Sequence, residues 1–197
     1  MNASVRKLGE GNDVKLIGMI ICLIVCTLLL SNLALCAPLE IKGCSIGGVE
    51  VGGNVSSLYS MMGKKFTLKS YKKQGAAERV VVFSGDSAIG EFQVTDEGKI
   101  IQGEMTSNFV APNGIDLRSN LGAVLDAYGK GKIDPTEAGY YVWFDKLPGI
   151  SFLISNHDVP KSLRNIPDDV FTNNHERKIL KLRNAKIKSI RVSCTKN

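Results

Sequence analysis

The sequence predicts an α+β fold built from two tandem strand–helix–antiparallel-strand repeats, which form a pseudo-symmetric body behind an N-terminal signal or anchor segment. Residues 48–54 are answered by residues 114–120 at a constant offset of 66 residues, and the match continues through the helix that follows each run. Self-similarity on this scale is typical of a repeated structural unit. We therefore expect repeat 1 at 44–107 and repeat 2 at 108–197, the second with an insertion at 156–178.

The N-terminal segment at 1–37 has the pattern of an export signal. A basic lead is followed at 16–39 by 24 residues without a charge. A basic lead, an apolar run and a more polar tail are typical of a signal peptide, and the uncharged run also exceeds the roughly 20 residues that span a bilayer. Three outcomes stay open: cleavage after Cys36 or Ala37, lipidation of Cys36, and retention as an anchor. All three predict an exported protein that is periplasmic or anchored at the outer membrane.

Each repeat carries one amphipathic helix. Asn54 and Asn120 are the predicted N-caps, because an asparagine oxygen accepts a hydrogen bond from an otherwise unpaired backbone N–H of the first turn. Apolar residues then recur at the spacing i, i+3, i+4, i+7, which places them on one face of the helix. They are Val55, Leu58, Tyr59 and Met62 in repeat 1, and Leu121, Val124, Leu125 and Tyr128 in repeat 2. Gly63 and Gly129 are predicted to end the helices in the left-handed conformation.

Short strands flank these helices and complete each repeat. The predicted strands are 48–51, 66–71, 79–83, 89–95 and 99–106 in repeat 1, and 114–117, 140–145, 150–155 and 186–193 in repeat 2. A helix that places an apolar face on an antiparallel sheet gives an α+β layer arrangement. The strand order between the two repeats does not follow from the sequence.

Two cysteines, Cys44 and Cys194, lie near the two ends of the folded region. In an oxidising compartment such a pair predicts one disulfide, and two free thiols are the alternative. If the cysteines pair, the first and last strands of the fold lie next to each other.

No residue pattern indicates catalysis, a cofactor or a metal site. The two histidines of the sequence, His157 and His175, lie in the insertion without a third ligand at metal-ligand spacing. Asp168 and Asp169 follow Pro167, which fits the first turn of a helix better than an acid–base pair or a calcium site. We therefore expect a protein without enzymatic activity or cofactor. An enzyme that uses His157, His175 and Asp168 is a further, weaker hypothesis.

A basic run near the C-terminus is the strongest candidate for a partner-binding patch in a chain of net charge +6. The patch consists of Arg177, Lys178, Lys181, Arg183, Lys186, Lys188 and Arg191. Such a patch can attract anionic lipid, lipopolysaccharide or an acidic protein face, whereas nucleic acid is not an expected partner of an exported protein. The alternative is the solvated face of an edge strand, where lysine blocks edge-to-edge pairing.

Four segments resemble one known family in their order and spacing. They are Ile100-Ile101, the run 108–117, Tyr128-Gly129 and the run 166–169. Over roughly 46–193 they resemble the sigma-E-regulated outer-membrane lipoproteins of proteobacteria, a domain family of unknown function. The chain departs from the lipoprotein pattern at Leu35, where a small residue is usual. The duplicated plan is also similar to the tandem modules of secreted β-lactamase inhibitor proteins and to the small lipoprotein of the outer-membrane assembly machine.

These resemblances imply a non-catalytic envelope protein or lipoprotein. We expect it to bind a protein or an anionic envelope component through a sheet face, the insertion or the basic run. The alternative is an inhibitor or immunity-type protein that blocks a hydrolase.

Overall fold

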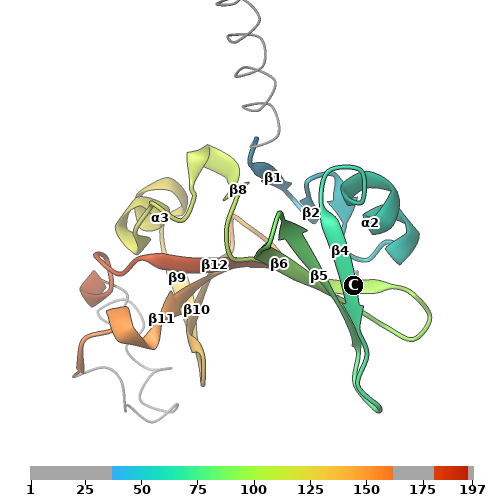
Figure 1. The fold of residues 1–197 in the computed structure, drawn as a ribbon. Helices are drawn as coiled ribbons and strands as arrows, with labels where there is room; N and C mark the ends of the chain where they lie inside the picture. Colours follow the sequence, from blue (N-terminus) through green and yellow to red (C-terminus); the bar gives the residue numbers. More distant parts are fainter. Residues whose placement is uncertain (1–36, 162–179, 195–197) are drawn as a thin grey trace, which may run out of the picture. The chain divides into compact units, whose positions relative to one another are not determined.

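Strands dominate the computed structural model, which describes residues 37–161 and 180–194 and has the mixed α+β class that the sequence predicts. The strands form an eight-stranded sheet and a four-stranded sheet. Figure 1 shows both helices on the same side of the larger sheet. The predicted signal or anchor segment, with Cys36, and most of the insertion lie outside the described residues. Within the two described ranges, no helix is long and apolar enough to cross a bilayer.

The eight-stranded sheet is antiparallel throughout. Its strands, in spatial order, are β4 (Thr67–Tyr71), β5 (Glu78–Ser84), β6 (Ser87–Val94), β7 (Ile100–Met105), β12 (Ile187–Val192), β11 (Ile150–Ser155), β10 (Gly139–Phe144) and β9 (Gly131–Thr136). The last strand of the chain, β12, is therefore a central strand. The interpretation of the basic run as part of a sheet edge is wrong, because β7 and β11 cover both sides of β12.

The smaller elements lie before and between the two groups of long strands. The four-stranded sheet has the order β3 (Val49–Glu50), β2 (Ser45–Ile46), β1 (Leu39–Lys42) and β8 (Phe109–Val110), and β1 and β8 are parallel. The helices are α2 (Val55–Met62) and α3 (Leu121–Tyr128), with short 3-10 turns η2 (Pro112–Gly114) and η3 (Asn156–Asp158).

The two halves of the chain share one order of elements. In each half, a helix is followed by four strands that neighbour each other in chain order, and the two groups meet where β7 pairs with β12. The same isolated bridge also recurs, between Asn54 and Lys99 in one half and between Asn120 and Lys186 in the other. The order of elements and this contact therefore recur in the two halves, while the pseudo-symmetric repeat stays a prediction.

Both predicted helix N-caps are confirmed. The side-chain oxygen of Asn54 accepts a hydrogen bond from the backbone N–H of Ser56, and that of Asn120 accepts one from the N–H of Ala123, each at 2.9 Å. These bonds satisfy donors that the first helical turn leaves without a partner.

Only one of the two glycines ends its helix with a positive φ, and its ψ of −138° lies outside the left-handed helical region. Gly129 has a φ of +87°, whereas Gly63 keeps a right-handed φ of −61°. A Cβ at Gly63 would lie 2.5 Å from the carbonyl oxygen of Tyr59, so this position excludes larger residues by close approach of the backbone. The prediction of a left-handed cap at Gly63 is wrong.

The strand predicted at 114–117 is absent from the described structure. The neighbouring strand is β8, and the chain then turns through η2. The side chain of Asp116 accepts a hydrogen bond at 2.8 Å from the backbone N–H of Arg118. An aspartate that bonds to the backbone two residues later stabilises a turn in place of an extended segment.

β9 forms one edge of the large sheet, and it is not among the strands predicted from the sequence. Pro135 lies inside it, and proline in a sequence argues against a central strand because it has no N–H to donate. At a sheet edge this missing donor costs nothing on the side that faces away from the neighbour. The edge position thus explains why the pattern did not predict a strand here.

The helices and the large sheet enclose one hydrophobic core. On β10, Tyr140, Val142 and Phe144 point into it, and the ring of Tyr128 from α3 lies 5.8 Å from that of Phe144. The helices therefore cover the face of the large sheet to which Tyr140, Val142 and Phe144 point.

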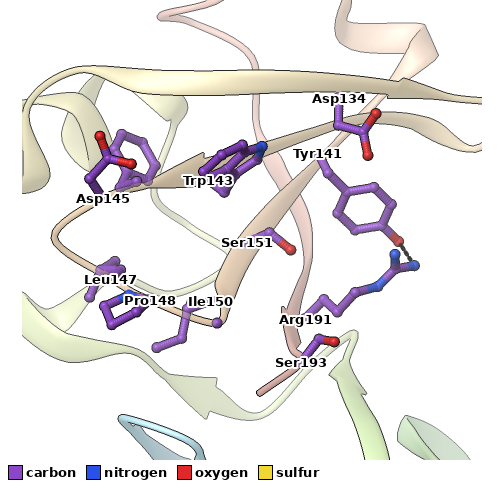
Figure 2. Close-up of a pocket in the computed structure, with 12 residues that line it drawn as sticks. Asp134, Tyr141, Trp143, Asp145, Leu147, Pro148, Ile150, Ser151, Arg191 and Ser193 are labelled. Carbon is purple, nitrogen blue, oxygen red and sulfur yellow. Dashed lines mark hydrogen bonds between the residues drawn. The ribbon is translucent and has the colours of Figure 1, made fainter. Parts of the chain in front are cut away.

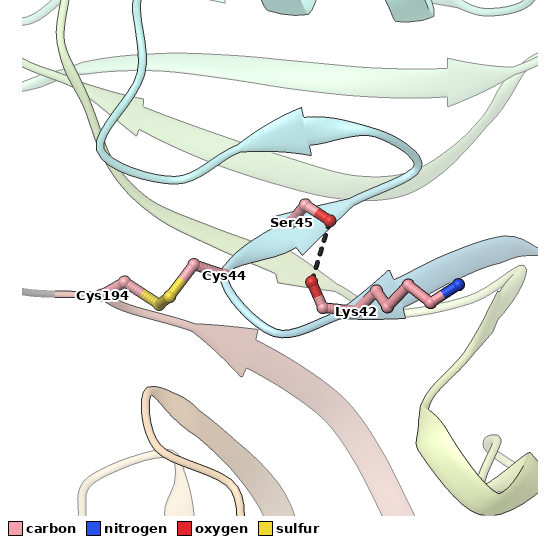
Figure 3. Close-up of a disulfide and its surroundings, with 4 residues drawn as sticks. All are labelled: Lys42, Cys44, Ser45 and Cys194. Atoms are coloured by element: carbon pink, nitrogen blue, oxygen red, sulfur yellow. Dashed lines mark hydrogen bonds between the residues drawn. A yellow bond between two sulfur atoms is a disulfide. The ribbon is translucent and has the colours of Figure 1, made fainter.

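A disulfide joins the small sheet to a residue that lies just after β12 of the large sheet. Cys44 and Cys194 are bonded, with their Cα atoms 5.8 Å apart, as Figure 3 shows. Beside it, the hydroxyl of Ser45 donates a hydrogen bond to the carbonyl of Lys42 at 2.9 Å, which closes the turn between β1 and β2. The pairing predicted from the sequence is present, and it is consistent with an oxidising compartment.

Candidate functional site

The face of the large sheet opposite the helices, called the open face below, carries the candidate site. Strand alternation places side chains there that the core does not use. On β10 these are Tyr141 and Trp143, which lie between the core residues Tyr140, Val142 and Phe144.

One row of side chains crosses the open face through all eight strands. The strand registers align Lys69 (β4), Val81 (β5), Glu91 (β6), Glu104 (β7), Arg191 (β12), Ser151 (β11), Trp143 (β10) and Lys132 (β9). Directly opposed side chains in such a row lie close enough to interact. The row therefore combines charged groups with a large aromatic ring on one surface.

A polar network occupies the centre of this row. The Glu104 carboxylate accepts hydrogen bonds from the hydroxyl of Ser189 at 2.6 Å and from Nη2 and Nε of Arg191 at 3.0 and 3.2 Å. The hydroxyl of Tyr141 donates to the same carboxylate at 3.2 Å, and Arg191 donates to the Tyr141 oxygen. The side chains of Glu104 and Arg191 are 16% and 30% exposed. Partial burial makes such a charge-assisted network more rigid and more costly to break than a surface ion pair.

Tyr141 lies on the open face and packs against Arg191 of the network. It is 5% exposed although it lies on the face away from the helices, and the guanidinium carbon of Arg191 lies 3.7 Å from its ring centroid. Burial first, and then the nearby Glu104 charge, raise the pKa of Tyr141 to about 12. The hydroxyl consequently stays protonated at neutral pH, so it acts as a hydrogen-bond donor and is a poor general base.

Two depressions lie on either side of Tyr141 and Arg191, which line both. One, of about 420 Å³, includes Glu91, Glu104 and Lys188. The other, of about 470 Å³, is shown in Figure 2. Its remaining lining residues are mostly apolar or hydroxyl-bearing: Trp143, Phe144, Leu147, Pro148, Gly149, Ile150, Ser151 and Ser193, with Asp134 and Asp145 at its border.

Large aromatic residues lie on both halves of the open face: Tyr141 and Trp143 on β10, and Tyr71 on β4 and Phe83 on β5 in the first half. Trp143 is 41% exposed, and Nζ of Lys132 lies 4.6 Å from its ring centroid. The matching row positions of the first half hold Val81 and Glu91. Tryptophan, tyrosine and arginine are the residues most enriched where a protein interface concentrates its binding energy. The open face of the second half therefore has the composition of a contact surface.

The residues of the predicted basic patch do not form one surface. Arg177 and Lys178 lie outside the described residues. Arg183 pairs with Asp126 of α3 at 2.7 Å, and Arg191 pairs with Glu104 on the open face. Lys181 and Lys186 are exposed, Lys186 forms an isolated bridge with Asn120 at the start of α3, and Lys188 lines the smaller depression. The described residues of the predicted basic patch therefore do not form one continuous basic surface.

The other candidate residues remain separate from this site. His157 lies in η3, while His175, Asp168 and Asp169 lie outside the described residues. Among the described residues, no three His, Cys, Asp or Glu side chains are grouped to hold a metal ion.

Sequence reasoning did not single out Glu104, Tyr141 or Trp143. Tyr141 and Trp143 occupy alternate positions in the run Gly139–Phe144, and this alternation was the available signal for a second, non-core face. The sequence around Glu104 carries no such signal, because the contacts of Glu104 depend on the pairing of β7 with β12.

The fold, but no family, is found among known proteins. The uncharacterized protein YfeY from Escherichia coli has a similar structure, with a TM-score of 0.55 at 16% sequence identity, over 80% of this chain and 99% of that one. At this identity the likeness concerns the fold alone. No family model and no curated protein matches the chain.

Proposed function

We propose that this chain is an exported, non-catalytic envelope protein that binds a protein partner through its open face. The observation that carries the proposal is the combination of an exposed Trp143 with the half-buried network of Glu104, Tyr141 and Arg191. A network that is held in place before binding loses little conformational entropy on complex formation. An exposed tryptophan beside it supplies the large apolar contact area that anchors an interface.

The export part of the proposal is supported by the disulfide and by the sequence of the N-terminal segment. A bond between Cys44 and Cys194 persists in the periplasm and at the cell surface and is rare in the cytosol. Lipidation of Cys36 and kinship with the sigma-E-regulated outer-membrane lipoproteins belong to the same proposal.

A protein partner fits the geometry better than an anionic membrane or lipopolysaccharide surface. A lipid surface requires several basic groups that point the same way. Here Arg183 and Arg191 are each bonded to an acid, and Glu91 and Glu104 lie on the open face. A surface of mixed charge with an aromatic residue is instead typical of protein interfaces.

Site-specific photo-crosslinking in cells tests the proposal. A photoreactive residue replaces Trp143 on the open face or, as a control, Tyr59 on α2; the two native side chains are similarly exposed, at 41% and 43%. We expect a discrete crosslinked product from position 143 that is absent from position 59. No product at 143, or the same products at both positions, would overturn the proposal.

The inhibitor hypothesis is a special case of the same docking. If the crosslinked partner is a hydrolase, its turnover with and without an equimolar amount of this chain decides the matter. Inhibition that is lost in Trp143→Ala assigns the inhibitor role, and unchanged turnover leaves a binding protein.

A further inference from the structure

Two lysines of the open face, Lys69 and Lys188, have no acidic partner among the described residues, and Lys69 lies over the ring of Phe83 instead. Glu91 is paired with Arg79, and Glu104 with Arg191. No carboxylate of the described residues pairs with Lys188. The smaller depression is therefore lined by two neutralised acids and one uncompensated cation.

A β-bulge explains why Lys188 is exposed there. In the pairing of β11 with β12, Leu153 faces Ser189 and the next residue, Ile154, faces Ile187. Lys188 is skipped in the register, so it has no counterpart on β11. Lys188 is exposed and lines the smaller depression, where Leu153 of β11 also lies.

Arg191 has donor capacity left beside this lysine. Its Nε and Nη2 donate to Glu104 and Tyr141. Its Nη1 has no hydrogen bond to any described residue, although a guanidinium carries five N–H donors. Lys188 and Arg191 both line the smaller depression, together with Thr106, and Nη1 of Arg191 has two N–H donors that no described residue accepts.

The larger depression begins on the other side of Arg191 and Tyr141. Trp143, Pro148 and Ile150 make it mainly apolar. An acidic group in the first depression would therefore have an apolar surface next to it, across a shared wall.

We propose that the partner inserts a carboxylate side chain between Lys188 and Arg191, and places a neighbouring apolar side chain against Trp143. This inference rests on the proposed function and adds the chemistry of the partner. The carboxylate supplies the charge that the open face lacks at Lys188, and the apolar side chain fills the depression beside it.

Peptide selection on the purified full chain tests this chemistry. A random heptapeptide phage library is selected on the wild type, and the enriched peptides are synthesised and measured by fluorescence anisotropy. The variants are Lys188→Glu, Lys188→Arg and Trp143→Ala. Lys64→Glu is the matched control, because it makes the same charge change at an exposed position just after α2, on the helix side of the sheet.

We expect the enriched peptides to carry Asp or Glu close to an aromatic or aliphatic residue. Their Kd should rise about tenfold in Lys188→Glu and with added salt, should rise in Trp143→Ala, and should change little in Lys188→Arg and Lys64→Glu.

Several results would overturn the inference while the crosslinking at Trp143 still stands. They are an absence of selected peptides, selection without acidic residues, or equal effects of Lys188→Glu and Lys64→Glu. Sedimentation that shows a dimer in the wild type and a monomer in Lys188→Glu would assign the surface to a second copy instead. Binding of phosphatidylglycerol vesicles that Lys188→Glu abolishes would assign it to a membrane.

Discussion

Tyr141 holds the centre of the open face together through a single hydroxyl. This oxygen accepts a hydrogen bond from Arg191 and donates one to Glu104, 37 residues away in sequence. The ring meanwhile lies against the guanidinium and leaves Tyr141 5% exposed. Removal of the hydroxyl alone therefore separates the polar role from the packing role.

Tyr141→Phe should lower the free energy of unfolding by about 1–2 kcal/mol, because it leaves part of a half-buried charge pair without a hydrogen-bond partner. Urea unfolding at neutral pH measures the change. Tyr59→Phe, at a side chain 43% exposed, is the control and should change the value by less than about 0.5 kcal/mol. Equal free energies of unfolding for the wild type and Tyr141→Phe would show that the Tyr141 hydroxyl does not contribute to stability.

The raised pKa of Tyr141 predicts that the folded protein loses stability at alkaline pH. The folded pKa of Tyr141 is about 12, above its ordinary value of 10.0. A raised pKa means that the folded state favours the protonated phenol, so its contribution is complete below pH 10 and is lost as the pH rises towards 12. Unfolding free energies of wild type and Tyr141→Phe should therefore converge between these pH values. A difference that stays constant across this range would contradict the burial of the phenol.

At the scale of elements, the pairing of β7 with β12 joins the two halves. Glu104 and Arg191 are direct register partners in this pair. The sequence offset that aligns 98–100 with 185–187 also aligns Glu104 with Arg191. Positions that this offset aligns thus face each other across the junction of the two halves, and opposite charges there avoid the repulsion that identical charged residues would produce.

Charge reversal tests this junction. Glu104→Arg and Arg191→Glu alone should each lower the unfolding free energy by about 3 kcal/mol, because each leaves like charges opposed in a partly buried pair. The double variant should recover a coupling energy of about 1–3 kcal/mol. Urea unfolding of the four proteins closes the cycle. Additive effects within about 0.5 kcal/mol would mean that the pair is not coupled.

The two helix caps offer a second comparison between the halves. Asn54→Ala and Asn120→Ala should each cost about 1 kcal/mol, because each removes the acceptor of a first-turn N–H. The residues lie in separate helices, so the double variant should show the sum of the two losses. Thermal unfolding followed by circular dichroism measures all three. A loss at one cap only would show that the two caps are not energetically equivalent.

The elements were predictable from sequence where a local rule determines them. Asn54 and Asn120 begin helices, and the short apolar run in 150–155 marks a strand, because both signals depend on residues that are close in sequence. β9 and the turn before α3 were missed, since an edge position and a side-chain bond at Asp116 override the local pattern. The site was missed for a related reason: Glu104 and Arg191 are 87 positions apart, and no local periodicity reports their register.

At the scale of the whole molecule, one covalent bond ties the first strands to the last. Cys44 lies between β1 and β2, and Cys194 follows β12, with a sequence separation of 150. The bond therefore closes a loop around almost every described element. The unfolded chain loses more entropy when a longer loop is closed, by about 5 kcal/mol for a loop of this length.

Loss of this disulfide should consequently remove a large part of the stability, since whole domains are stable by only about 5–15 kcal/mol. We expect Cys44→Ser/Cys194→Ser to unfold at a markedly lower urea concentration than the oxidised wild type. A reductant should shift the wild type towards the variant and leave the variant itself unchanged. Wild type and variant with the same urea midpoint would show that the bond does not constrain the unfolded chain.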